Sequence, residues 1–252
     1  MPINIDIIIL SFAKNEELKA LTIQTIDTLL ASENAAEIAF NILVIESNKT
    51  LQPYQFEHTT TIYPHQKFGF NKYLNLGIQA THNNYVCLCN NDLIFHKGWA
   101  GTLLKMASTI NNQHWVLSPF CELQHRDFTE LKEPTEGYFG YFAGYCFFTN
   151  RETLKLVGPL DEKINFWYAD MDFIEVMTAH HIPHYLVPEA RVSHLTSQVT
   201  VGFNELDKLK YTYYPSIYFR YKWKDKNILL YVKRMLYYGF QYIMYYLKSL
   251  WA

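Results

Sequence analysis

Apolar and polar residues near the start of the chain follow the pattern of a strand, a helix and a second strand. Residues 5–10 are an apolar run rich in β-branched side chains, which predicts a short buried strand. Asn15 can cap a helix that starts at Glu16, and apolar residues then recur at helical spacing as far as Leu30. Residues 40–45 form the second apolar run. The pattern predicts a β-α-β unit and hence a parallel sheet with a right-handed crossover.

The alternation continues less regularly through the middle of the chain. A buried strand is expected to stop at the polar triplet Asn90-Asn91-Asp92, and a turn is expected at residues 158–161. The other expected elements are strands at 60–63, 85–89, 115–120, 141–148 and 184–187 and a helix at 71–80. No linker rich in glycine, serine or proline divides the 252 residues, so one α/β domain with an appended tail accounts for the length.

Polar residues follow three of the expected strands at the point where each strand ends. Ser11-Phe12 follows the first strand, Glu46-Ser47 the second, and Asn90 to Asp92 the strand at residues 85–89. Ligands of open α/β sheets bind just beyond the carboxyl ends of the strands. The sequence therefore predicts one ligand site built from these three segments.

The polar triplet favours a divalent cation over a glycine-rich loop as the partner of a phosphate group. The segment after the first strand has no glycine, so neither the dinucleotide-binding nor the P-loop fingerprint is present. Mg²⁺ and Mn²⁺ are held by one or two carboxylates plus substrate phosphates, and Asp92 at a strand end suits this role. A polar turn that caps a following helix is the other interpretation. His194 also follows an expected strand, although a lone histidine there is more often structural than a ligand.

Two carboxylates, Asp170 and Asp172, stand two residues apart in an aromatic stretch that includes Phe166, Trp167 and Phe173. Apolar surroundings raise the pKa of a carboxylate toward the range useful for a general base. The same two residues can instead cap a helix that runs on through residue 177. The sequence favours the catalytic interpretation and leaves the cap open.

Composition fits a folded protein with a distinct C-terminal end. Apolar residues make up 49% and charged residues 18% of the chain, which argues against wholesale disorder. The formal net charge is −2, yet residues 205–252 hold nine basic against three acidic residues. The four cysteines lack C-x-x-C spacing, and no cleavable signal is visible. These features predict a soluble or peripheral protein in the reducing cytoplasm, with one end that touches an anionic surface.

The pattern of residues in the C-terminal tail (205–252) predicts an amphipathic helix. Its apolar stripe consists of Leu229, Val232, Leu236, Phe240, Ile243, Leu247 and Leu250. The longest uncharged stretch, residues 235–247, is shorter than the roughly 20 residues needed to span a bilayer. Two interpretations stay open: the stripe lies on an anionic membrane, or it packs on the catalytic domain or a second subunit as in a homodimer. The apolar stripe does not suit binding of nucleic acid, so we expect none.

The order of these segments resembles the family 2 glycosyltransferases of the GT-A fold, particularly the bacterial branch that builds lipopolysaccharide, capsule and related glycans. The resemblance covers roughly residues 3–195. The matching pieces are 7–12, 43–48, 68–70, 75–78, 89–92, 143–144, 151–152, 157–158, 160–162, 169–172, 187–190 and His194. Each piece is short, and the shared order carries the resemblance.

The resemblance implies a fold, a domain division and a set of site residues. The fold is a GT-A, Rossmann-like, mixed and mostly parallel sheet flanked by helices, with a catalytic domain at 1–204 and a basic, aromatic helical extension at 205–252. Asp170 is implied as the catalytic base, with Asp172 beside it, and Asp92 and His194 as ligands of Mn²⁺ or Mg²⁺. The implied donor-binding residues are Ser11, Phe12, Glu46, Gly69, Asn75, Asn90 and Asn91.

The activity implied is inverting transfer of a sugar from a nucleotide-sugar donor to a hydroxyl of a glycan or lipid-linked acceptor, in the biosynthesis of bacterial surface polysaccharide. Two positions depart from the family pattern. Asn90 replaces the first acid of the D-x-D motif, and Ala169 replaces the acid that usually precedes the base. These losses leave room for a non-catalytic carbohydrate-binding or scaffold protein of the same fold. A nucleotidyltransferase is a further alternative, but the glycine- and arginine-rich loop expected of it is missing.

Overall fold

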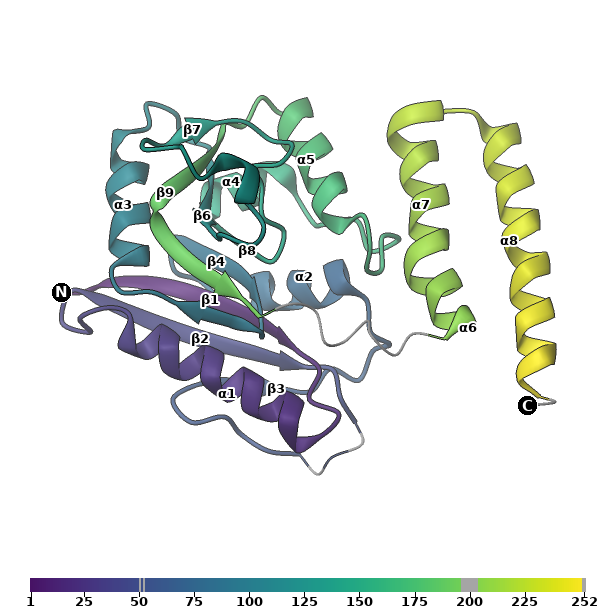
Figure 1. The fold of residues 1–252 in the computed structure, drawn as a ribbon, viewed down its shortest axis with the longest axis horizontal. Helices are drawn as coiled ribbons and strands as arrows, with labels where there is room; N and C mark the ends of the chain where they lie inside the picture. Colours follow the sequence, from purple (N-terminus) through teal and green to yellow (C-terminus); the bar gives the residue numbers. More distant parts are fainter. Residues whose placement is uncertain (50, 52, 196–203, 251–252) are drawn as a thin grey trace.

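The computed structural model describes residues 1–49, 51, 53–195 and 204–250, which form a mixed α/β sheet flanked by helices (Figure 1). The strands, in their order across the sheet, are β3 (Thr60–Ile62), β2 (Ile38–Glu46), β1 (Ile3–Ser11), β4 (Tyr85–Asn90), β8 (Cys146–Asn150), β6 (Val116–Phe120), β9 (His184–His194) and β5 (Leu93–Phe95). A short strand, β7 (Thr135–Glu136), pairs with β9 outside this path. The predicted α/β class is confirmed.

Along this path only β8 and β5 run opposite to the other strands. Strands β3, β2, β1 and β4 are mutually parallel, whereas β8 runs antiparallel to both β4 and β6. The β-α-β unit predicted at the N-terminus is present, with α1 (Glu16–Ala31) as its crossover. Asn15 caps this helix as expected, because its side chain accepts a hydrogen bond of 2.9 Å from the backbone N–H of Leu18.

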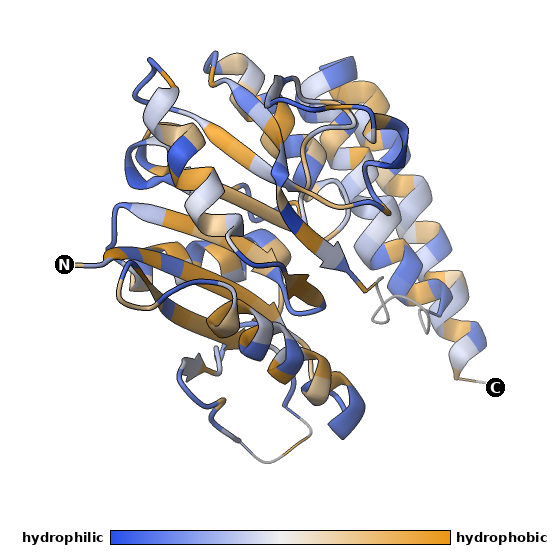
Figure 2. Cartoon of the chain, turned by 60° about the vertical axis from the view of Figure 1, so that its left-hand side comes forward, coloured by the Kyte–Doolittle hydropathy of each residue, from blue (hydrophilic) through white to orange (hydrophobic). Residues whose placement is uncertain are grey.

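Two hydrophobic layers cover the sheet, and β1 divides its side chains between them. Ile5, Ile7 and Ile9 pack in the layer beneath α1 and α3 (Trp99–Thr109), whereas Ile8 and Leu10 pack in the opposite layer. Alternation of side chains along a strand produces this division. The second layer is covered by α2 (Phe70–Ala80), α4 (Arg151–Val157) and α5 (Ala169–Ala179). Figure 2 shows the central strands as hydrophobic over most of their length.

The sequence pattern misplaced one strand and missed several elements, which include α4, β7 and the 3₁₀ helix η1 (Arg126–Phe128). The expected strand at 141–148 begins only at Cys146, because residues 138–143 fold into turns in which the N–H of Phe142 donates to the carbonyl of Tyr138. Neither α3 nor the three-residue β5 was predicted. Pairing with β5 also extends β9 as far as His194, so this histidine ends a strand instead of following one.

The C-terminal residues form two long helical stretches that stand side by side at one edge of the molecule (Figure 1). The first is built from four consecutive segments: α6 (Glu205–Lys208), the π-helical η2 (Leu209–Tyr213), α7 (Tyr214–Phe219) and the π-helical η3 (Arg220–Asp225). Lys226 then adopts a left-handed conformation, and Asn227 caps α8 (Ile228–Ser249). The predicted helical tail is therefore present. Among the described helices, none is both long and apolar enough to cross a membrane.

Candidate functional site

A cavity of about 410 Å³ lies at the carboxyl ends of β1 and β4, and we call it the strand-end cavity. Its wall includes Ser11, Phe12, Ser47 and the triplet Asn90 to Asp92. The parallel register explains why these segments meet, since Leu10 pairs with Asn90 across the β1–β4 ladder. The three segments expected to converge from the sequence therefore line one cavity.

Aromatic residues close the strand-end cavity opposite the strands. Phe68, Phe70, Phe166 and Tyr211 line it, and their rings contact one another with centroid distances between 5.9 and 6.4 Å. Lys14 adds a cation beside the end of β1. None of these residues was named as a donor-binding residue from the sequence. The resemblance does cover residues 68–70, whereas nothing in the sequence indicated that Tyr211 or Lys14 lies at this cavity.

Glu46 lies behind the cavity wall. Its carboxylate is fully buried and accepts hydrogen bonds of 2.7 Å from the Ser11 hydroxyl, the Tyr54 hydroxyl and the backbone N–H of Asn48. The N–H of Ala13 also donates to it, at 3.2 Å. Glu46 therefore joins the loops that follow β1 and β2. Its oxygens are hydrogen-bonded to protein groups and do not line the cavity.

Two other residues implied as donor-binding, Asn75 and Gly69, are also not among those that line the strand-end cavity. The Asn75 side chain is buried on α2, where its amide donates to the carbonyl of Leu160 and its oxygen accepts from the N–H of the same residue, each at 2.9 Å. It therefore fixes the turn that precedes α5. Gly69 is the N-cap residue of α2, between two phenylalanines that line the strand-end cavity.

The triplet itself is held rigidly at the end of β4. The N–H of Asn90 donates to the carbonyl of Tyr145, at 2.8 Å. The Asn91 side chain donates to the hydroxyl of Thr22, at 2.8 Å, and its carbonyl accepts from Thr25 at the same distance. These bonds fix the turn between β4 and β5 against α1, and so determine where Asp92 points.

Asp92 and His194 form the strongest candidate for a cation site. The Asp92 Oδ1 and the His194 Nε2 lie 3.1 Å apart, and both atoms are buried. They are not aligned as a hydrogen bond, and neither has a hydrogen-bond partner elsewhere in the described part of the chain. Buried polar atoms are normally paired, so two unpaired ones that face each other indicate a missing common partner. The ring of Tyr145 stacks on His194 and fixes its orientation.

The chemistry of this pair fits a hard divalent cation. An octahedral ion with ligands at about 2.1 Å holds neighbouring ligand atoms about 3.0 Å apart, which is close to the separation found here. Among the described residues (1–49, 51, 53–195 and 204–250), no group of three or more His, Cys, Asp or Glu side chains could hold a metal ion. Two protein ligands are nonetheless a normal complement for Mg²⁺, which takes its other ligands from substrate phosphates and water.

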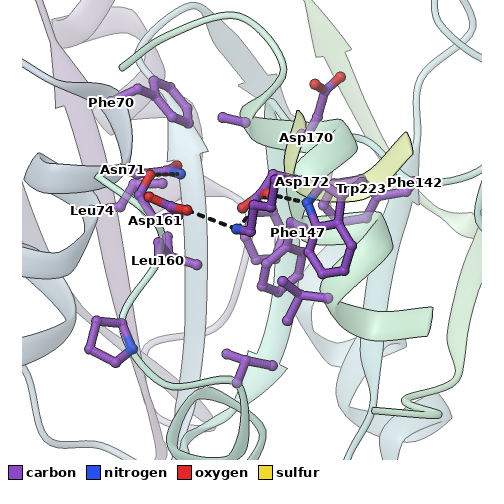
Figure 3. A pocket seen from close by; sticks show the side chains of 17 residues that line it. Phe70, Asn71, Leu74, Phe142, Phe147, Leu160, Asp161, Asp170, Asp172 and Trp223 are labelled. Carbon is purple, nitrogen blue, oxygen red and sulfur yellow. Dashed lines mark hydrogen bonds and ion pairs between the residues drawn. The ribbon is translucent and has the colours of Figure 1, made fainter. Parts of the chain in front are cut away.

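A second cavity, of about 310 Å³, contains the expected catalytic carboxylates (Figure 3). We call it the acidic cavity because Asp161, Asp170 and Asp172 line it. Phe70 lines this cavity and the strand-end cavity alike, so the two are neighbours. The remaining wall is largely apolar and includes Phe142, Phe147, Leu160 and Phe173.

Asp170 and Asp172 occupy contrasting positions in the first turn of α5. Asp170 is exposed, and its carboxylate points away from the side on which Asp172 meets Trp223 (Figure 3). Asp172 is buried and accepts hydrogen bonds from Lys222 and Trp223. Burial raises the pKa of Asp172, although the bonds from Lys222 and Trp223 oppose the shift. The raised pKa expected of an apolar surrounding therefore belongs to Asp172, and Asp170 has the open approach that a base requires.

Residues 144–145 connect the two candidate sites. A Cβ atom on Gly144 would come within 2.7 Å of the Asp170 Cβ, so only glycine allows α5 to approach this closely. The next residue, Tyr145, stacks on His194 and binds the N–H of Asn90. A single turn of the chain thus contacts Asp170 at the acidic cavity and His194 beside the strand-end cavity.

The overall fold is similar to that of known glycosyltransferases. A crystal structure of GalNAc-T7 with UDP, GalNAc and Mn²⁺ matches with a TM-score of 0.64 at 12% identity, over 87% of this chain and 50% of that one. The present chain thus spans half the length of the GalNAc-T7 chain. S. aureus TarS 1–349 matches with a TM-score of 0.56 at 12% identity, over 89% of this chain and 73% of that one.

The catalytic domain of Drosophila β1,4-galactosyltransferase 7 in complex with xylobiose matches with a TM-score of 0.52 at 13% identity, over 80% of this chain and 74% of that one. No protein-family model and no curated protein sequence matches the chain. The chain therefore has the GT-A glycosyltransferase fold, which confirms the fold class predicted from the sequence.

Proposed function

We propose that the protein is an inverting, cation-dependent glycosyltransferase that moves one sugar from a nucleotide-sugar donor to a hydroxyl of a glycan or lipid-linked acceptor. The observation that carries this proposal is the contact of Asp92 with His194, whose facing atoms are buried, lie 3.1 Å apart and have no hydrogen-bond partner within the described chain. It stands at a strand end beside a cavity that adjoins the cavity of Asp170. The fold shared with glycosyltransferases of known structure supports the same chemistry.

The strand-end cavity would hold the donor. The ring of Phe12 can pack against a nucleobase, while Lys14 lies on the same wall and can pair with a phosphate. Asp92 and His194 would bind Mn²⁺ or Mg²⁺, which neutralises the charge that develops on the departing diphosphate. Serine and asparagine side chains at the ends of β1 and β4 supply hydrogen-bonding groups for the ribose and the donor sugar.

Asp170 would act as the base in a single displacement. Its carboxylate accepts the proton of the acceptor hydroxyl as the acceptor oxygen forms a bond to the anomeric carbon. The bond between that carbon and the diphosphate oxygen breaks, and its electron pair leaves with the nucleoside diphosphate. Because attack and departure occur on opposite faces, the configuration of the anomeric carbon inverts. Its exposed position at the start of α5 gives Asp170 room for this approach.

Release of a nucleoside diphosphate from nucleotide sugars tests the proposal directly. The full-length protein is incubated with UDP-, GDP- and dTDP-sugars, with Mn²⁺ or with EDTA, and we expect cation-dependent release from at least one donor. Asp170→Asn should lower transfer by roughly 10²- to 10⁴-fold and leave donor binding intact, whereas Asp27→Asn on the exposed face of α1 should change neither. If no donor gives product or a thermal shift, the carbohydrate-binding alternative is favoured instead.

We propose further that the outer face of α8 lies on an anionic membrane surface. The apolar residues of the predicted stripe are exposed, with Leu229 at 79%, Leu236 at 72% and Phe240 at 61%. None of the residues of α8 is buried, so the stripe is not packed on the catalytic domain. The helix carries Lys233, Arg234 and Lys248 and no acidic residue, which gives it the charge that complements anionic lipids.

The inner face of the cytoplasmic membrane, where surface polysaccharide is built on lipid carriers, is the location that this arrangement favours. Flotation of the full-length protein with phosphatidylglycerol vesicles and with neutral phosphatidylcholine vesicles tests it. We expect binding to the anionic vesicles, loss of binding in Leu236→Gln/Phe240→Gln, and no loss in Tyr231→Phe, which alters the inner face. Equal flotation of all variants, or a concentration-dependent dimer that the double substitution abolishes, contradicts membrane docking and favours a second subunit.

A further inference from the structure

The C-terminal segment contributes two side chains to the acidic cavity. Lys222 on η3 lies 2.9 Å from an oxygen of Asp161 and 2.8 Å from one of Asp172. The indole N–H of the neighbouring Trp223 donates to the same Asp172 oxygen, at 2.6 Å. Figure 3 shows Trp223 at the edge of the cavity, with its indole directed at Asp172. The tail is therefore attached to the wall of the cavity.

This attachment is stronger than an ordinary surface ion pair. The side chains of Lys222 and Asp172 are 25% and 5% exposed, so water screens their interaction only in part. The hydroxyl of Tyr218, one turn earlier, donates to Asp161 at 3.0 Å. The turn before α5, the first turn of α5 and the distant C-terminal segment thus meet at one network of hydrogen bonds. The network fixes the indole of Trp223 in place.

What remains open beside this network has the character of a sugar site. A pyranose ring carries apolar C–H faces and a polar edge of hydroxyl groups. The aromatic rings of Trp223, Phe70 and Phe142 can pack against the apolar face of the sugar. Asn71 and Asp170 can hydrogen-bond its hydroxyl groups. Its volume of about 310 Å³ is at the lower end of the range for ligand pockets, which suits one sugar residue.

We propose that the acidic cavity binds the terminal sugar of the acceptor, and that Lys222 and Trp223 of the C-terminal segment determine which acceptor is accepted. The inference rests on the proposed function, because it identifies the hydroxyl that Asp170 deprotonates as one held in this cavity. The tail would then form part of the active site and would also attach the protein to a membrane surface.

The charges in the cavity define the class of sugar. Three carboxylates, of Asp161, Asp170 and Asp172, face a single cation, Lys222. Even when Lys222 neutralises one of them, two negative charges remain near any bound ring. An acidic sugar such as a uronic acid would place a like charge within a few ångströms of these carboxylates, which is unfavourable. The acceptor residue in this cavity is therefore a sugar without an acid group.

Binding of simple glycosides to the full-length protein tests the class of acceptor. The probes are methyl glycosides of glucose, galactose and N-acetylglucosamine, with methyl glucuronide as the acidic counterpart, and saturation-transfer NMR measures their contact. We expect at least one neutral glycoside to bind without competing with the nucleotide. The glucuronide should not bind. Absence of binding by every neutral glycoside, or equal binding of the glucuronide, overturns the proposal.

Variants of the tail separate a binding role from a structural one. Trp223→Ala should raise the acceptor KM, or weaken glycoside binding, by roughly tenfold. Trp223→Phe keeps an aromatic ring but not the N–H, and should retain most of the affinity. Lys224→Gln is the matched control, because Lys224 lies on the same segment and pairs with Glu175 outside the cavity. Donor hydrolysis in the absence of acceptor should be unchanged in Lys224→Gln.

The two proposals fail in different ways. If the wild-type protein hydrolyses no nucleotide sugar, the proposed function itself is wrong. If donor hydrolysis is normal but Trp223→Ala leaves acceptor affinity unchanged, only the acceptor assignment is wrong. If Trp223→Ala lowers donor hydrolysis and transfer equally at an unchanged acceptor KM, Trp223 is a structural clamp and the assignment is again overturned.

Discussion

Asp92, just before β5, faces His194 at the end of β9, with the carboxylate oxygen and the ring nitrogen 3.1 Å apart. The pairing of Leu93 with His194 in the β5–β9 ladder sets this distance, because it places the start of one strand beside the end of the other. The backbone adds to it, since the N–H of Leu195 donates to the carbonyl of Asp92 at 2.9 Å. The pair is thus held by the sheet and not by any bond between the two side chains.

Removal of either side chain should therefore abolish cation binding without unfolding the protein. Asp92→Asn and His194→Ala are each expected to lower Mn²⁺-dependent donor turnover by about 100-fold or more, since a bound cation supplies several kcal/mol of charge stabilisation. EDTA should have the same effect on the wild-type protein, and added Mn²⁺ should restore it. Isothermal titration with Mn²⁺ in the presence of a nucleoside diphosphate provides a readout independent of turnover. Unaltered Mn²⁺ affinity in both variants would exclude this pair as the cation site.

Gly144→Ala should impair transfer selectively. The added Cβ would lie 2.7 Å from the Asp170 Cβ and 3.6 Å from its Cα, so α5 or the turn at Gly144 must move by several tenths of an ångström. Small misplacements of a reacting group can cost up to about 100-fold in rate. We expect transfer to fall by 10- to 100-fold while donor affinity, measured by thermal shift with the nucleotide, remains at the wild-type value. A fall in both would mean that Gly144 supports the whole site.

The parts of the fold that follow from short-range pattern were predictable from the sequence. The period of apolar residues gave β1, α1 and β2, and the polar residues at strand ends gave the lining of the strand-end cavity. The strand expected at residues 141–148 was wrong over residues 141–145, where aromatic residues favour a strand locally but the chain turns and Gly144 packs closely against Asp170 of α5.

Contacts between residues far apart in the sequence could not be predicted from the pattern of apolar and polar residues. Nothing near Asp172 in sequence indicates that its carboxylate is satisfied by Lys222 and Trp223, which the chain brings back from the C-terminal segment. Glu46 illustrates the same limit, since a carboxylate at a strand end can face a ligand or, as here, join two loops behind the cavity. The sequence therefore indicated the candidate site, but not which of its acids are free of other partners. Their assigned roles remain predictions.

Gly77, the single glycine within α2, should not tolerate a side chain. A Cβ at this position would lie 2.4 Å from the Ile8 Cγ2 and 3.1 Å from the Ile45 Cδ1, in a fully buried contact between α2 and the sheet. Gly77→Ala is expected to lower the free energy of unfolding by about 1–3 kcal/mol through overpacking. Gly239→Ala on α8, where a Cβ meets nothing within 4 Å, should instead stabilise the helix by roughly 0.5–1 kcal/mol. Urea denaturation of the two variants decides between these opposite signs.

Two buried histidines should make the protein unstable in mild acid. His125 accepts a hydrogen bond from the N–H of Cys121 through Nδ1 and therefore donates through Nε2 to the carbonyl of Tyr141, at 3.2 Å. His184 donates through Nδ1 to the carbonyl of Gly137, so its Nε2 accepts from a serine hydroxyl. In each ring the nitrogen without a proton already faces a donor, and a second proton would break that bond.

Burial lowers the pKa of His125 and of His184 to about 4, against 6.5 for a free histidine. Between these values the unfolded chain binds protons that the folded protein excludes, so each histidine contributes stability that is complete above pH 6.5 and is lost as the pH falls toward 4. The loss is on the order of 1.4 kcal/mol per pH unit for each ring within this window.

Unfolding by urea at a series of pH values between 7 and 4 measures this dependence. His184→Gln, which can keep one donor and one acceptor in place, should flatten the decline by about half, and His125→Gln should act similarly. His82→Gln is the control, because His82 is exposed, and it should leave the slope unchanged. A slope that is the same in all four proteins would show that neither buried ring is responsible for the acid sensitivity.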